Sequence, residues 1–154
     1  MTLYLVQHGK NLSKEDDPSQ PLSSTGREET QRIAEVARGY AVPVRRIEHS
    51  PKERAGETAT ILASFLEPED GYAERQGIKA LDEVAPIAEE VQTRDKLMLV
   101  GHLPFLERLA TLLITGTQEP KVITFQNSGI ICLDQDPETS LWSIQWCLMP
   151  RIGG

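Results

Sequence analysis

Three short apolar runs, each followed by a helical pattern, constrain the fold of this chain most strongly. The runs cover residues 3–8, 44–49 and 96–100, and helical patterns follow over residues 23–39, 50–66 and 103–116. Strands that alternate with helices pair in parallel, because each helix returns the chain to the same end of the sheet. The sequence therefore predicts an α/β three-layer sandwich, with a mostly parallel sheet and helices on both faces.

Residues that favour helix starts mark where two of these helices begin. Ser23 suits the N-cap of the first helix, and a capping box of Thr25 and Glu28 is the alternative. For the second helix, Ser50 suits the N-cap and Glu53 would complete a capping box across the intervening proline. Both patterns predict helices that leave the sheet directly after a strand.

Weaker patterns complete the layout. Residues 11–20 are polar and predict a surface loop beside the end of the first strand. A third strand over residues 78–81, a short helix over residues 86–91, and two final strands over residues 130–133 and 141–148 are expected. No internal repeat interrupts this order, so we expect one domain over residues 1–154.

Charge and composition exclude several classes of function. The chain has 154 residues and a net charge of -7, which argues against a general binder of nucleic acid or anionic membrane. No apolar run is long enough to span a membrane, and the N-terminus lacks a basic, apolar leader. The cytoplasm is therefore the expected location, and the oligomeric state stays open.

The cysteines and histidines give no sign of a metal site. Cys132 and Cys147 lie in strand-like surroundings, where we expect small buried apolar side chains rather than a disulfide. The three histidines are scattered and no cysteine lies at a zinc-ligand spacing from them. We therefore expect no metal and no cofactor.

Two of the predicted strands end at a histidine. His8 follows the first strand and is followed by Gly9, while His102 follows the third run after Gly101. Ligands of open parallel sheets bind outside the carboxyl ends of the strands. Both imidazoles therefore face one crevice if their strands are neighbours. Gly9 would let the backbone turn sharply and approach the ligand.

Arg54 stands in the first turn of the second helix, close to Lys52. The helix dipole makes a cation unfavourable there, unless an anion docks against the guanidinium and the free backbone amides. The alternative is a solvated arginine on a surface helix. Together with the two histidines, Arg54 points to a site for a phosphoryl group or a similar anion.

These stretches together resemble the histidine phosphatase superfamily, which has the phosphoglycerate-mutase-like fold. The matching motifs are Gln7-His8-Gly9, Ser50-Pro51-Lys52-Glu53-Arg54-Ala55 and Gly101-His102. The compact chain, Pro21-Leu22-Ser23 before Gly26, and the segment from Trp146 to Pro150 are most similar to the SixA type of phosphohistidine phosphatase. The resemblance covers nearly the whole chain.

The resemblance implies a chemistry that agrees with the residues. His8 would accept the phosphoryl group, because a neutral imidazole is a competent nucleophile at cellular pH. Arg54 and His102 would bind the phosphoryl oxygens, and water would then hydrolyse phospho-His8. The implied substrate is phosphohistidine on a protein, since the short chain has no insertion to roof the crevice. A phosphatase of small phosphorylated metabolites is an alternative.

Gln7 departs from the family pattern, which has an arginine before the nucleophilic histidine. Glutamine can donate a hydrogen bond but not a charged, bidentate pair, so the rate could fall by roughly 10²–10³. Lys10 is a candidate to offset part of this loss, and the alternative is a solvated lysine. A catalytically weakened or inactive phosphate-binding regulatory module is therefore a second hypothesis.

Other candidates are less specific. Glu83 is the nearest match to the glutamate that acts as general acid in many family members, and its alternative is a plain exposed carboxylate. His49 is expected to be structural. Ser13, Asn127 and Ser128 are candidates to border the mouth of the crevice.

Overall fold

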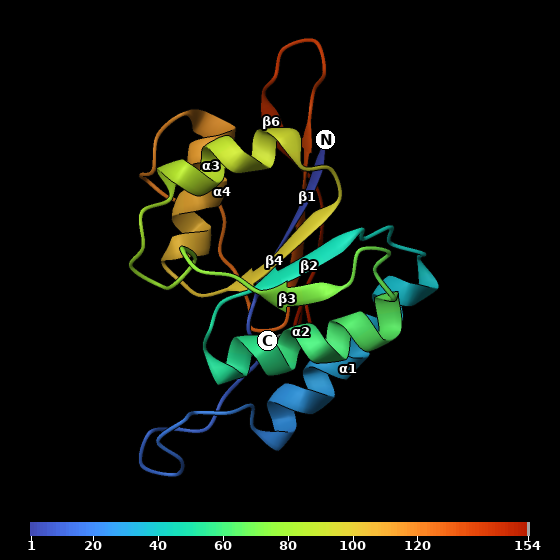
Figure 1. Ribbon diagram of the computed structural model, residues 1–154, viewed down its shortest axis with the longest axis vertical. Helices are drawn as coiled ribbons and strands as arrows, with labels where there is room; N and C mark the ends of the chain where they lie inside the picture. The colour runs from blue at the N-terminus through green and yellow to red at the C-terminus, as the bar shows by residue number, and fades with distance from the viewer. Residues whose placement is uncertain (154) are drawn as a thin grey trace.

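The computed structural model describes residues 1–153, which form one mixed β-sheet between two layers of helices (Figure 1). The strands are β1 (Thr2–Gln7), β2 (Arg46–His49), β3 (Tyr72–Glu74), β4 (Leu97–Gly101), β5 (Ile130–Gln135) and β6 (Trp142–Leu148). The helices are α1 (Ser24–Gly39), α2 (Glu53–Leu66), α3 (Ala85–Glu90) and α4 (Phe105–Thr115), with a 3-10 turn η1 (Val91–Thr93). The predicted α/β sandwich is confirmed.

The strand order of the sheet is β3-β2-β4-β1-β5-β6. β3, β2, β4 and β1 are parallel to one another, whereas β5 pairs antiparallel with both β1 and β6. β1 and β4 are direct neighbours, with Gln7 opposite Gly101 at their carboxyl ends. The two histidine-bearing strand ends therefore meet at the centre of one edge of the sheet.

Alternating side chains of β1 pack into two separate cores. Leu3 and Leu5 lie in the core beneath α3 and α4, while Tyr4 and Val6 lie in the core beneath α1 and α2. All four side chains are buried, so helices cover both faces of the sheet as the sequence predicted (Figure 1). This double burial explains why β1 has a continuous apolar run rather than an alternating pattern.

The prediction of a third strand over residues 78–81 is wrong. β3 instead comprises Tyr72–Glu74 and pairs with β2, with Ile47 opposite Tyr72. β3 is a short edge strand whose outer residues are exposed, so it carries no apolar signature in the sequence. Ile78 is fully buried, but it belongs to the segment that leads from β3 to α3.

One of the two predicted helix starts is confirmed and the other is wrong. Ser23 does cap α1, because its hydroxyl accepts a hydrogen bond from the Gly26 amide, while the alternative cap Thr25 lies inside the helix. α2 begins later than predicted, with Lys52 at the N-cap and no side-chain cap, so no capping box forms between Ser50 and Glu53. Ser50 is fully buried and has a different role, described below.

The two cysteines differ from each other. Cys132 is buried as predicted, whereas Cys147 is exposed, because β6 is an edge strand that the helices cover only in part. Both thiols are free. Burial raises the pKa of the Cys132 thiol to about 12, so it remains protonated and behaves as an apolar side chain.

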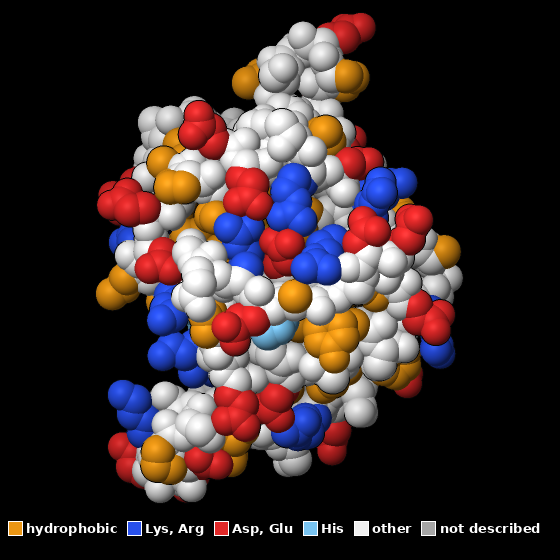
Figure 2. All heavy atoms as spheres, viewed as in Figure 1, with side chains coloured by type: hydrophobic (Ala, Val, Ile, Leu, Met, Phe, Trp, Pro, Cys, Tyr) orange, Lys and Arg blue, Asp and Glu red, His pale blue; other side chains and the backbone are white. Residues whose placement is uncertain are grey.

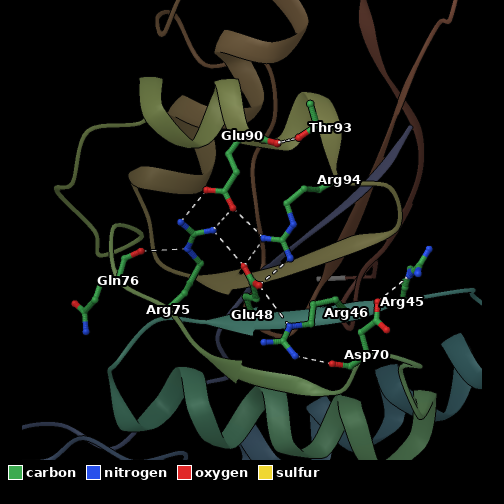
Figure 3. Close-up of polar contacts among 9 residues, drawn as sticks. All are labelled: Arg45, Arg46, Glu48, Asp70, Arg75, Gln76, Glu90, Thr93 and Arg94. Atoms are coloured by element: carbon green, nitrogen blue, oxygen red, sulfur yellow. Dashed lines mark hydrogen bonds and ion pairs between the residues drawn. The ribbon is translucent and has the colours of Figure 1, made fainter.

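A network of charged side chains fixes the segment after β3. The Glu48 carboxylate on β2 accepts hydrogen bonds from Arg75 at 3.2 Å and from Arg94 at 2.8 and 2.9 Å, and Glu90 on α3 accepts from the same two arginines (Figure 3). Burial raises the pKa of Glu48, but the two arginines outweigh it and hold that pKa below its usual range. The network joins β2, α3 and the segment that carries Glu83.

Candidate active site

His8 lies directly after β1, at the centre of the carboxyl edge of the sheet. Its backbone amide donates to the Gly101 carbonyl at 3.0 Å, and its carbonyl accepts from Asn127 Nδ2 at 2.9 Å. The rings of His8 and His102 have centroids 5.0 Å apart and planes inclined by 54°. The structure thus brings together the two histidines that the sequence placed at strand ends.

The His8 ring is oriented by a hydrogen bond to its own neighbour. Nδ1 lies 2.7 Å from the Gly9 carbonyl oxygen. A carbonyl can only accept, so Nδ1 carries the hydrogen, and Nε2 of the neutral ring holds the free electron pair. Burial lowers the pKa of His8, the Gly9 hydrogen bond opposes that effect, and the charge of Arg54 adds to it. His8 therefore presents an uncharged, nucleophilic Nε2.

Gly9 is required because space is short, rather than because the backbone turns sharply. A Cβ at this position would lie 2.8 Å from Thr30 Oγ1 and 3.1 Å from Ser128 Oγ. The φ angle of Gly9 is not left-handed. Its amide donates to Thr58 Oγ1 at 2.9 Å, which ties the residue after the nucleophile to α2.

Ser50 is a site residue that sequence reasoning missed. Its Oγ lies 2.5 Å from His102 Nε2 and accepts the Lys52 amide at 3.3 Å. The Ser50 hydroxyl has one hydrogen and two lone pairs, so it can accept the amide and still donate to Nε2. In the tautomer in which Ser50 donates, neutral His102 carries its hydrogen on Nδ1. The serine-proline pair resembled a helix cap, and only the neighbouring β4 reveals its partner.

His102 is uncharged at neutral pH. Burial lowers its pKa to about 4, and electrostatic interactions with His8, Arg54 and Lys52 act in the same direction. An imidazole held neutral by burial becomes protonated readily when an anion arrives beside it. The pair of histidines therefore suits a site that receives negative charge.

The low pKa of His102 predicts that acid destabilises the fold. As the pH falls through about 6.5, the unfolded chain binds a proton at this residue. The folded chain does so only near pH 4. The free energy of unfolding should therefore fall by about 2 kcal/mol between about pH 7 and about pH 5. Urea unfolding of the natural chain and of His102→Gln at several pH values measures this change. The free energy of unfolding should depend less steeply on pH in the variant, and the same pH dependence in both proteins would contradict the low pKa of His102.

Arg54 is the second residue of α2 and is half-buried. Burial lowers the pKa of both His8 and His102, and the positive charge of Arg54 lowers both further. Within residues 1–153, Arg54 forms no ion pair. A half-buried, unpaired guanidinium whose charge acts on two neutral imidazoles is a combination suited to binding an anion.

Gln7 and Lys10 flank His8 without adding charge to this cluster. The Gln7 carbonyl accepts from the Ser128 amide at 2.9 Å, and its side chain forms no hydrogen bond within residues 1–153. The Lys10 ammonium lies 3.7 Å from Glu29 on α1. The contact that the Lys10 ammonium makes is therefore with Glu29, at a distance longer than a hydrogen bond.

Glu83 is exposed and directly precedes the N-cap of α3. It lies in the segment after β3, which passes beside Gly101: the Ile78 carbonyl oxygen is 3.4 Å from where a Gly101 Cβ would lie. Glu83 forms no ion pair within the described part of the chain. Its role as general acid stays a prediction.

The remaining candidates have structural roles in this geometry. His49 Nδ1 lies 2.9 Å from the Ser50 carbonyl oxygen. Ser13 Oγ accepts the Asp16 amide at 3.2 Å, within the polar loop. Ser128 is fully buried and its Oγ lies 2.7 Å from Thr30 Oγ1, so with Asn127 it supports the backbone around His8.

Comparison with known proteins assigns the chain to a family. A model of the histidine phosphatase superfamily (branch 1) matches residues 3–95, which is more than half of the chain. The chain therefore belongs to the histidine phosphatase superfamily. No curated protein sequence shows significant similarity to it.

Solved structures show the same fold. The protein histidine phosphatase SixA, solved with tungstate, is 22% identical, with a TM-score of 0.84 and 97% of each chain covered. A SixA protein from Agrobacterium tumefaciens is also 22% identical, with a TM-score of 0.78 and the same coverage. A mycobacterial glucosyl-3-phosphoglycerate phosphatase is 14% identical, with a TM-score of 0.70 and coverage of 96% of this chain and 99% of that chain.

Residues 1–153 contain neither a membrane-spanning helix nor a cluster of metal ligands. Among these residues, no helix is long and apolar enough to cross a bilayer. Within the same part of the chain, no group of three or more His, Cys, Asp or Glu side chains is arranged to hold a metal ion.

Proposed function

We propose that this chain is a metal-independent phosphatase that forms a phosphohistidine intermediate on His8 and removes phosphoryl groups from phosphohistidine on proteins. The observation that carries the proposal is the free Nε2 of His8, whose ring centroid lies 5.0 Å from that of His102 and whose pKa is lowered in part by the charge of Arg54. A nucleophile, a hydrogen-bond donor and a fixed cation around one point are what phosphoryl transfer needs.

Two displacements complete the reaction. His8 Nε2 attacks the phosphorus, the bond from phosphorus to the substrate nitrogen breaks, and the departing imidazole takes up a proton. Arg54 and His102 Nδ1 bind the phosphoryl oxygens as charge spreads over them. Water then attacks phospho-His8, which releases inorganic phosphate and restores neutral His8. Glu83 is the candidate that would supply the proton to the departing group.

The proposed substrate follows from the similarity to SixA structures and from the short chain, which has no long insertion to enclose a small metabolite. A protein-borne phosphoryl group needs an open site. We further propose that the protein acts in the cytoplasm, on phosphohistidine proteins of signalling pathways. Small phosphorylated metabolites are the competing substrates.

Phosphate release from a phosphohistidine-bearing protein tests the proposal. The natural chain should release phosphate, and His8→Ala should lose at least about 10⁴ of the rate because no other group replaces the nucleophile. Labelled phosphate bound to the natural chain through an acid-labile bond, and absent from His8→Ala, would identify the intermediate. Faster hydrolysis of small phosphorylated metabolites than of the phosphoprotein would show that small metabolites are the preferred substrates.

Gln7 favours one rival function, a phosphate-binding regulatory module without turnover. It leaves the family's arginine position neutral beside the nucleophile. The rival predicts that inorganic phosphate binds to the natural chain while neither it nor His8→Ala releases phosphate from any substrate. Calorimetric titration with phosphate alongside the hydrolysis assay separates the two functions.

A further inference from the structure

Position 7 leaves the site short of one positive charge. Gln7 is neutral, and the ammonium of nearby Lys10 lies against Glu29 instead of the histidines. A phosphoryl group carries close to two negative charges at neutral pH. Arg54 alone offsets about half of that charge, so a second cation near the histidines would have a large effect.

Lys52 is the residue best placed to be that cation. It occupies the N-cap of α2, and its backbone amide donates to Ser50 Oγ at 3.3 Å. The same hydroxyl lies 2.5 Å from His102 Nε2. Two hydrogen bonds therefore connect the Lys52 backbone to the second histidine, and Arg54 follows two residues later.

The Lys52 side chain is free to act on a ligand. It is exposed and forms no ion pair within residues 1–153. Its charge acts on His102, since it is one of the causes that lower the pKa of that ring. Figure 2 shows Lys and Arg side chains along the left side of the molecule, with Asp and Glu side chains beside them.

We propose that Lys52 supplies a positive charge to the phosphoryl group, which the neutral Gln7 cannot do. The second cation of the site would then lie at the start of α2 instead of at the end of β1. The inference rests on the proposed function, because it concerns the same anion site. A lysine is a point charge on a flexible stem, so it attracts a dianion from the rim of the site without the paired geometry of an arginine.

A double-mutant cycle between positions 7 and 52 tests the inference with inorganic phosphate as the probe. Lys52→Gln should weaken phosphate binding about 10-fold in the natural chain, and Lys52→Arg should largely preserve it. In a Gln7→Arg background, the same Lys52→Gln change should cost less than about 3-fold, because the restored arginine makes the lysine redundant. Lys96→Gln is the matched control. Lys96 directly precedes β4 at the amino end of the strand, whereas the histidines lie at the carboxyl end, so this change should leave phosphate binding unchanged.

The outcomes separate this inference from the proposed function. Equal losses in both backgrounds would show that Lys52 attracts anions independently of position 7, and no loss would show that it does not reach the phosphoryl group. Either result overturns the inference, even if the chain hydrolyses phosphohistidine. A coupled cycle in a chain without turnover would support the inference and contradict the proposed function.

Discussion

Arg54→Ala is expected to lower kcat/KM for phosphohistidine hydrolysis by about 10²–10³-fold, with the fold intact. The guanidinium is half-buried and unpaired within residues 1–153, so removing it does not leave a carboxylate without its partner. It removes a positive charge that acts on both imidazoles. Arg54→Lys should recover only part of the activity, because an ammonium cannot form two parallel hydrogen bonds to a phosphoryl group.

Steady-state hydrolysis and urea unfolding together measure the effect. Arg45→Ala is the matched control, because Arg45 is exposed beside Asp70 and precedes β2 at the opposite edge of the sheet. That variant should change kcat/KM by less than about 2-fold. An Arg54→Ala enzyme with nearly natural kcat/KM would show that another group binds the phosphoryl oxygens.

Gly26→Ala is expected to cause the largest loss of stability among single-methyl additions to this chain, about 3 kcal/mol. A Cβ at Gly26 would lie 2.0 Å from the Lys10 carbonyl oxygen, which is backbone and cannot rotate away. The same oxygen accepts the Ser23 amide at 2.9 Å and the Ser23 hydroxyl at 3.2 Å. The methyl group would separate α1 from the residues that follow His8, so activity should fall with stability.

Gly39→Ala is the control for this effect. Gly39 is the last residue of α1, a Cβ added to it would meet no atom within 4 Å, and its φ is not left-handed. Alanine there should change the free energy of unfolding by no more than about 1 kcal/mol. Similar losses for both variants in urea unfolding would contradict the claim that close approach of Lys10 requires glycine at position 26.

Much of the fold followed from the sequence, because burial on both faces of the sheet leaves a strong apolar signal. Residues 3–6 of β1 and 97–100 of β4 are continuous runs of aliphatic and aromatic residues, which is typical of strands between two helical layers. The histidines at those ends could be assigned to one edge from strand direction alone. Their contact required β1 and β4 to be neighbours, and strand order is not encoded in local pattern.

The errors arose where local patterns have two physical readings. Ser50 before a proline fits a helix cap, but its amide extends the pairing of β2 with β4 by donating to the Val100 carbonyl at 3.1 Å. Its hydroxyl lies 2.5 Å from His102 Nε2 and also accepts the amide of Lys52, the N-cap of α2. β3 was missed for the opposite reason, since backbone hydrogen bonds alone define it and its side chains at Tyr72 and Glu74 are exposed.

The attachment of both histidines to the central strands has a consequence for how such an enzyme can diverge. The spacing of His8 and His102 depends on the pairing of β1 with β4, in which Gln7 lies opposite Gly101. Residues 9–23, 75–84 and 116–129 are separate connecting segments outside the helices and strands of the sandwich. Mutation can therefore remodel these segments while the two histidines keep their separation.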